Sequence, residues 1–410
     1  MKLDFKVNSQ KMFAVMVYWI WAQTILVTYI RAVVMRLPYL GAFPDAVMMT
    51  MLLIILVTAI PSMQLTKQNL FFVITCVIIY LLNWCFFCAQ REIIEEKSTY
   101  FLFEVLPLYM VGASLGRNRD REHIIRMLYR ISMITIPTTM VYRALFASPM
   151  SEVASLYEGN MVYAYDLLPH LCLIAFHAVR KTNIWNVCFS VLGGVYLMLQ
   201  GTRGAVVLYL TLIAVLFIMG RKSHGAVTRT IVVFGGAITF YLSPLYSAFI
   251  MFMYQEAQTL GLSVRIFEKI LSGSAGQSSG RDFIREALMK AIWENPILGY
   301  GILSDRVIAG NYAHNIAIEL WVEFGLIFGS ILLSTLFYIL VKGYRCANTE
   351  DEKGLIIALI CARFGQLFLS GSYLDSPLLF FLLGLCATSM HIISTKYIDP
   401  IRRNNANCTD

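Results

Sequence analysis

Residues 316–341 read IAIELWVEFGLIFGSILLSTLFYILV. This apolar run is longer than the roughly 20 residues that a helix needs to cross a bilayer. Backbone groups in lipid must find hydrogen-bond partners within their own segment, so a helix is the structure expected for it. Similar runs recur along the 410 residues, of which 58% are hydrophobic and 14% charged, whereas about a quarter are charged in a soluble chain. The sequence predicts an all-α polytopic membrane protein.

The apolar runs predict about twelve transmembrane helices in a single integral membrane domain, residues 1–410. Basic clusters such as Arg180-Lys181, Arg221-Lys222 and Arg402-Arg403 then fall on one side, which the positive-inside rule makes the cytoplasm. Both termini are therefore expected inside, in a bacterial cytoplasmic membrane. The net charge of +8 is spread over short loops without a basic stripe, which argues against a nucleic-acid partner. The helices cover residues 12–34, 45–61, 70–90, 99–116, 127–147, 163–179, 184–200, 205–220, 229–250, 316–341, 354–374 and 376–395.

Residues 251–313 form a large polar loop that this topology places outside the cytoplasm. Two short helices are expected in it. The second begins near Ser279, a suitable N-cap, and Asp282 completes a capping box. Asn295-Pro296 ends this helix, and Gly299-Tyr300-Gly301 forms a turn. An apolar stripe on the helix is expected to face the bundle or the membrane surface and consists of Phe283, Leu288, Ala291 and Ile292.

Four arginines on the outward side are candidates for binding an anion. Arg203 lies between glycines in Gly201-Thr202-Arg203-Gly204, where it can grip a phosphate bidentately or only snorkel to the interface. Arg281 lies in the first turn of the loop helix, whose free N–H groups favour an anion. Arg285 follows one turn later on the same face, although both arginines also fit a solvated helix face. Arg265 is a weaker candidate.

His314 is the one histidine on the outward side of this topology. It precedes the 316–341 helix, and Asn315, Glu319 and Glu323 follow it closely. An imidazole oriented by a carboxylate or amide is a suitable general base near neutral pH. The alternative is an interfacial histidine with no chemical role. Ionisable residues inside predicted spans, or close to their ends, are functional candidates too, and they are Arg31, Glu104, Arg143, Asp166, His170, Glu319, Glu323, Arg363 and Asp375.

No metal-binding pattern is present in the sequence. The outer loop has no DxD, and the chain has no HxxH or HExxH. No metal or other cofactor is therefore expected. If the substrate carries a diphosphate, arginines must neutralise its charge.

Several of these motifs together resemble a known family. They are Thr202-Arg203-Gly204, Ser279-Gly280-Arg281, Asn295-Pro296-Ile297-Leu298-Gly299-Tyr300-Gly301, and His314-Asn315 followed by Glu319 and Trp321-Val322-Glu323-Phe324-Gly325-Leu326. In order, spacing and side of the membrane, the set is similar to the O-antigen ligase and O-antigen polymerase superfamily. The helix count and the large loop before the last three helices extend the resemblance to the whole chain.

The resemblance implies a metal-independent, inverting glycosyltransferase that acts outside the cytoplasmic membrane. Its donor would be a glycan on undecaprenyl diphosphate, and Arg203 and Arg281 match the arginines thought to hold the diphosphate. His314 matches the histidine proposed to activate the acceptor hydroxyl. Arg285, Arg265, Asn315 and Glu319 are expected to contact substrate. A flippase and a chain-length regulator are further candidate partners, in addition to membrane lipids.

The motifs leave two reactions of this superfamily open. A polymerase of an O-antigen, capsule or exopolysaccharide pathway would transfer the growing chain to a lipid-linked repeat unit, and we favour it because such polymerases are numerous and divergent. A ligase would transfer the finished chain to a lipid A core. A lipid-linked oligosaccharide flippase is a less favoured alternative, because transporters commonly show internal repeats and this chain has none at a period of 20–50 residues.

Overall fold

The structure is a computed structural model in which every described residue with regular structure is helical. It describes residues 9–34, 50, 54, 57, 60–64, 66–146, 153–181, 183–200, 202–219, 244–259, 264–272 and 281–390. Among them no strand occurs, which confirms the predicted all-α class. The chain divides into two compact units, residues 1–128 with 280–410 and residues 129–279, which are described separately.

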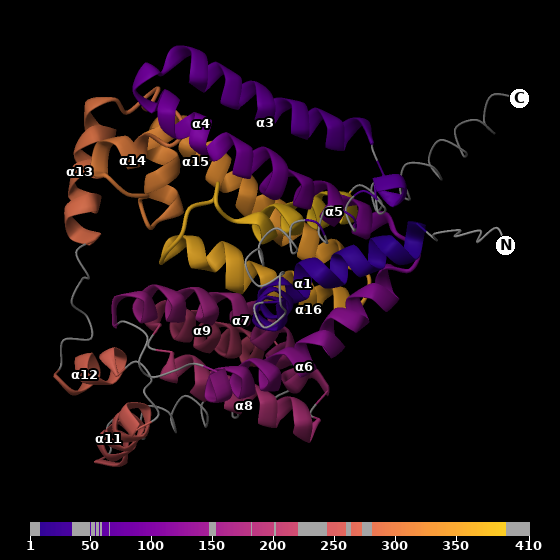
Figure 1. Cartoon of the computed structure of the whole chain (residues 1–410). Helices are drawn as coiled ribbons and strands as arrows, with labels where there is room; N and C mark the ends of the chain where they lie inside the picture. The colour runs from indigo at the N-terminus through magenta and orange to yellow at the C-terminus, as the bar shows by residue number, and fades with distance from the viewer. Residues whose placement is uncertain are drawn as a thin grey trace, which may run out of the picture. The chain divides into compact units, whose positions relative to one another are not determined.

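Unit 1 contains the N-terminal helices and the helices around His314 (Figure 1). Two glycines allow the helices α5 (Leu106–Arg117) and Pro377–Met390 to approach closely. A Cβ at Gly112 would lie 2.0 Å from the carbonyl oxygen of Phe381, and a Cβ at Gly384 would lie 2.1 Å from the carbonyl oxygen of Tyr109. Small residues at such crossings are typical of helix packing in membranes. Its elements include α1 (Ser9–Val34), α3 (Lys67–Phe86), α4 (Arg91–Tyr100), α5 (Leu106–Arg117), α13 (Arg281–Glu294), α14 (Ser304–Ala309), α15 (Ile316–Cys346) and α16 (Glu350–Leu359).

Unit 2 contains a packed group of three helices, α7 (Val153–Lys181), α8 (Ile184–Leu199) and α9 (Arg203–Met219). α6 (Arg121–Phe146) begins in unit 1 and continues into this unit. The hydroxyl groups of Ser190 and Tyr209 join α8 to α9 at 2.5 Å. α11 (Pro244–Thr259) packs with α12 (Arg265–Leu271) around a small core of Ile250, Met253, Ala257 and Phe267.

Three helices in the described part of the chain are long and apolar enough to cross a membrane: Lys67–Phe86, Cys88–Arg117 and Ile316–Cys346. Shorter apolar helices cover Ile184–Met198, Arg203–Phe217 and Pro377–Met390. These helices support a membrane protein. The predicted count of twelve spans stays a prediction, because most of the 45–61 helix and most of the 229–250 helix lie outside the described residues.

One predicted span near the C-terminus is shorter than expected. The run predicted over 354–374 begins as α16, continues as π-helix Ile360–Phe364, and ends in the 3₁₀-helix Gly365–Phe368. Gly371 then has a φ of +97°, which a helix cannot continue. The consequence is a non-helical segment, residues 369–376, that lies beside the start of α15 through contacts described below.

The polar loop differs from the expectation in two respects. It contains α14, which the sequence did not predict, and α11 extends into it as far as Thr259. α13 ends at Glu294 as predicted, and Leu288, Ala291 and Ile292 are buried against Ile318 and Val322 of α15. Phe283 is 74% exposed, so it does not pack with these three residues. Ser279, the predicted N-cap, lies outside the described residues.

Candidate functional site

A loop, residues 296–301, forms hydrogen bonds to α15 where that helix is interrupted at Gly325. Gly325 has a φ of +76° and a ψ of 168°, a combination that essentially only glycine adopts. The break frees backbone groups, and residues 296–301 satisfy them. Leu326 N donates to Pro296 O at 2.7 Å, Tyr300 N to Val322 O at 2.9 Å, and Gly301 N to Glu323 O at 2.9 Å. The NPILGYG motif is therefore a structural brace of α15.

Glycine is required at this brace for steric reasons, which gives a stability prediction. A Cβ at Gly325 would lie 2.2 Å from Ile297 O. We expect Gly325→Ala to lose about 1–2 kcal/mol from the backbone conformation and about 1–3 kcal/mol more from overpacking, measured by thermal or denaturant unfolding in detergent. Gly310→Ala is the control, because Gly310 also has a positive φ but meets nothing within 4 Å. Equal losses in the two variants would contradict the brace.

His314 lies at a strained position directly before α15. Its φ is +55°, which is uncommon for a residue with a side chain. The Tyr312 ring contacts the imidazole in a tilted arrangement, with centroids 4.0 Å apart and ring planes at 49°. Asn315 caps α15 by accepting from Ala317 N at 3.0 Å. Nδ1 of His314 is buried without a hydrogen-bond partner among the described residues. The expected orientation by Glu319 or Glu323 is absent from these contacts, since both carboxylates accept from other donors.

Arg281 is the first residue of α13 and lies close enough to His314 to affect its protonation. One guanidinium nitrogen donates to Leu369 O at 2.5 Å, and Asn315 Nδ2 donates to the neighbouring Phe368 O at 3.5 Å. The carbonyl groups of Phe368 and Leu369 thus position the side chains of Asn315 and Arg281. Burial and, to a lesser extent, the positive charge of Arg281 together lower the pKa of His314 to about 4. The imidazole is therefore neutral at pH 7.

A buried ionic cluster lies behind His314. Asp305 is fully buried, and its Oδ2 accepts from Ala313 N at 2.9 Å. The Arg306 guanidinium contacts Asp305 Oδ1 and Asp375 Oδ2, each at 2.9 Å, and Glu319 Oε1 at 3.8 Å. Burial raises the pKa of Asp305, although Arg306 and the Ala313 amide act in the opposite direction. We name Asp305, Arg306, Glu319 and Asp375 the Arg306 cluster.

The same cluster connects to the segment after the 3₁₀-helix. The hydroxyl of Ser372 donates to Glu319 Oε1 in a short hydrogen bond, and Tyr373 N donates to Glu319 Oε2 at 3.4 Å. The Tyr373 hydroxyl donates to Glu323 at 2.6 Å, and Glu323 also accepts from Leu303 N at 2.7 Å. Both glutamates of α15 are thus buried and engaged by protein donors. The predicted contact of Glu319 with substrate has no support in these hydrogen bonds.

The other predicted anion ligands lie on three different helices. Arg285 is exposed one turn after Arg281 on α13. Arg265 begins α12 and Arg203 begins α9, both in unit 2, so their proximity to Arg281 and His314 stays a prediction. Within the structure's described ranges, Arg281, His314 and Asn315 are the predicted site residues that lie together, and Glu319 lies beneath them in the Arg306 cluster.

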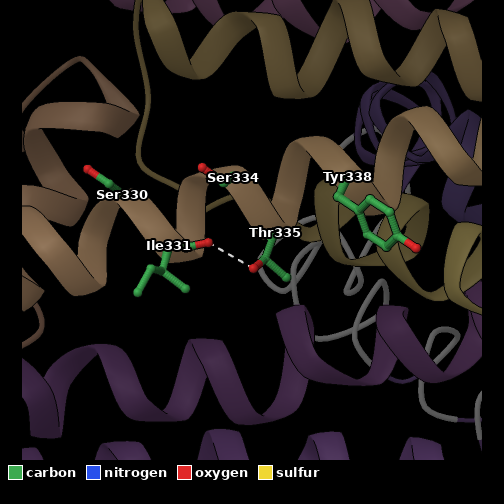
Figure 2. Close-up of a pocket in the computed structure, with 5 residues that line it drawn as sticks. All are labelled: Ser330, Ile331, Ser334, Thr335 and Tyr338. Atoms are coloured by element: carbon green, nitrogen blue, oxygen red, sulfur yellow. Dashed lines mark hydrogen bonds between the residues drawn. The ribbon is translucent and has the colours of Figure 1, made fainter.

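A separate hollow runs along α15, and Figure 2 shows its lining. Ser330, Ile331, Ser334, Thr335 and Tyr338 border it, and Thr335 Oγ1 donates to Ile331 O at 2.8 Å. These residues follow the break at Gly325, whereas His314 precedes it. The lining has neither an arginine nor a histidine, so it lacks the groups that would bind an anion or accept a proton. We do not include it in the site.

Sequence reasoning missed Asp305, Arg306, Ser372 and Tyr373. A signal was present in Asp305-Arg306, two adjacent residues of opposite charge that lie nine and eight positions before His314 in a polar loop. Asp375 is among the functional candidates predicted from the sequence, and it lies in the cluster with 38% of its side chain exposed. These residues meet because the chain bends at residues 369–376. The helix predicted over 354–374 is incompatible with that bend.

A comparison with protein families bears on the resemblance that the motifs carry. A family model described as O-Antigen ligase matches residues 188–333, which include Arg203, Arg281 and His314. The match supports the resemblance to the O-antigen ligase and O-antigen polymerase superfamily that the motifs predicted. The family and the apolar helices together indicate a membrane enzyme of the glycan-transfer type. Searches among curated proteins and among solved structures find no match.

Proposed function

We propose that this protein transfers a glycan from undecaprenyl diphosphate to a sugar hydroxyl on the outer side of the bacterial cytoplasmic membrane. The observation that carries the proposal is the proximity of the Arg281 guanidinium to the neutral His314 imidazole at the start of α13 and α15. A fixed cation beside a proton acceptor suits a reaction whose leaving group is an anion and whose nucleophile must lose a proton.

In the proposed reaction, an acceptor hydroxyl attacks the anomeric carbon of the donor sugar. The new carbon–oxygen bond forms as the bond to the diphosphate breaks, and the electron pair leaves with the diphosphate. Arg281 and the first-turn N–H groups of α13 stabilise that charge. The hydroxyl proton passes to Nε2 of His314, because Nδ1 is the buried nitrogen. One displacement inverts the anomeric centre, and these groups perform it without a resident metal.

Within this chemistry we favour a repeat-unit polymerase over a ligase, because such polymerases are numerous and divergent. The test is to supply the purified protein with lipid-linked repeat unit as the sole glycan. A polymerase is expected to give a ladder of longer lipid-linked chains, resolved by gel electrophoresis. A protein that forms product only after lipid A core is added is a ligase. Movement of the lipid-linked unit across a vesicle bilayer without any new glycosidic bond would contradict both.

The same assay tests the remaining features of the proposal. EDTA is expected to leave the rate unchanged, and inhibition that magnesium reverses would contradict a metal-independent reaction. NMR of the first product's anomeric centre reports inversion or retention. Protease access to residues 281–294 in oriented vesicles tests the side of the membrane, and cleavage from the cytoplasmic side alone would contradict the topology.

A further inference from the structure

The Arg306 cluster is buried beneath the site and is too well satisfied to bind substrate directly. Asp305 and Glu319 are both fully buried, and a buried carboxylate is costly unless it is paired and hydrogen-bonded. Apolar residues would fill the same space at a lower desolvation cost, so packing alone does not account for these carboxylates. The contacts of each member indicate what the role is.

Asp305 holds the backbone that carries His314. Its Oδ2 accepts from Ala313 N at 2.9 Å, one residue before the imidazole, and its Oδ1 accepts from Arg306 N at 2.9 Å. A hydrogen bond to a charged acceptor is about twice as strong as a neutral one. This bond offsets the strain of the positive φ at His314 and therefore fixes where the imidazole projects.

Arg306 and Glu319 extend the same connection to Arg281. Arg306 joins Asp305 to Glu319 of α15, and Glu319 holds Ser372 and Tyr373. Three residues before Ser372, Leu369 O accepts the hydrogen bond from Arg281. Polar contacts thus run from the Ala313 amide through the cluster to Ser372. The chain itself joins Ser372 to Leu369, whose carbonyl accepts from the Arg281 side chain.

We propose that Asp305, Arg306 and Glu319 are positioning residues that set the separation between the His314 imidazole and the Arg281 guanidinium. The inference rests on the proposed function for the roles of those two groups. Displacing a reacting group by about 1 Å can reduce a rate about 100-fold. Loss of the network therefore lowers kcat by about that factor, while donor affinity changes much less because Arg281 keeps its charge.

The test uses near-isosteric variants of the full-length protein, Asp305→Asn and Glu319→Gln. Glu352→Gln is a matched control, because Glu352 is also buried, lies 3.8 Å from Arg121 and accepts from the Ser389 hydroxyl, at the start of α16. The first readout is the rate at which diethyl pyrocarbonate modifies His314, followed by mass spectrometry, and it needs no substrate. The second is glycan transfer with separate kcat and KM values for the lipid-linked repeat unit.

The two cluster variants are expected to show altered His314 modification and a kcat lower by about 100-fold, with Glu352→Gln unchanged in both. Arg306→Lys is expected to retain more activity than Arg306→Met, since it keeps a cation in the cluster, and this pair decides the matter if neither isosteric variant folds. Wild-type modification and transfer in folded variants would overturn the proposal. If the wild-type protein transfers no glycan, the proposed function fails, and the modification rates still decide whether the cluster positions His314.

Discussion

Glycan transfer by His314→Ala is expected to fall by about 10²- to 10⁴-fold, the usual contribution of a positioned general base. The imidazole in the native protein is neutral, because burial and the charge of Arg281 lower its pKa to about 4. It is thus able to accept a proton throughout the physiological pH range. The loss should appear in kcat, with donor KM little changed, in the lipid-linked repeat-unit assay.

His123→Ala is the control for this substitution, because His123 is exposed on α6 in the same unit. It should transfer glycan at the wild-type rate. The thermal unfolding of His314→Ala also needs comparison with wild type, since alanine retains the strain at this positive φ. A folded His314→Ala protein with full activity would remove the imidazole from the mechanism.

The sequence predicted the parts of the site that depend on local pattern. The apolar run from residue 316 predicted the start of α15, and Asn295-Pro296 predicted the end of α13. Both follow from side chains near one another in the chain. The proximity of Arg281 and His314 had its basis in the resemblance to a family, because no periodicity relates positions 33 residues apart.

The parts that were missed depend on backbone pairing between distant segments. NPILGYG was grouped with the substrate-site motifs, yet its carbonyl and amide groups complete the break at Gly325. Glu319 was expected at the substrate, but the bend at residues 369–376 brings Ser372 and Tyr373 onto its oxygens. The bend reads LSGSYLDS, a largely polar stretch between two apolar runs, and hydropathy could not show that this stretch folds back onto α15.

Arg281→Ala is the second substitution with a large expected effect, a decrease of about 10²- to 10³-fold in kcat, which is typical when one donor to a developing anion is removed. Arg281→Lys should recover only part of the rate, because an ammonium group lacks the planar fork that binds a phosphate bidentately. Lys290→Ala serves as the control on the same helix, since its side chain is 80% exposed and 4.0 Å from Glu294.

The pH dependence distinguishes Arg281 from a residue that only stabilises the fold. Removing its charge should raise the pKa of His314 from about 4 toward its ordinary value, although burial still holds it lower. NMR titration of the imidazole should show this shift in Arg281→Ala. The free energy of unfolding should also depend on pH. The pKa of His314 is 6.5 in the unfolded chain and about 4 in the native protein, so native stability is lost as the pH falls from about 6.5 toward 4.

In Arg281→Ala this acid-dependent loss should shrink, because the native and unfolded pKa values of His314 move closer together. A bound diphosphate should act on His314 in the same direction as the substitution, since its negative charge offsets the guanidinium. Donor binding would then make the imidazole a stronger base at the step where it must accept the hydroxyl proton. An unchanged His314 titration in both Arg281→Ala and the wild-type protein with undecaprenyl diphosphate would contradict this coupling.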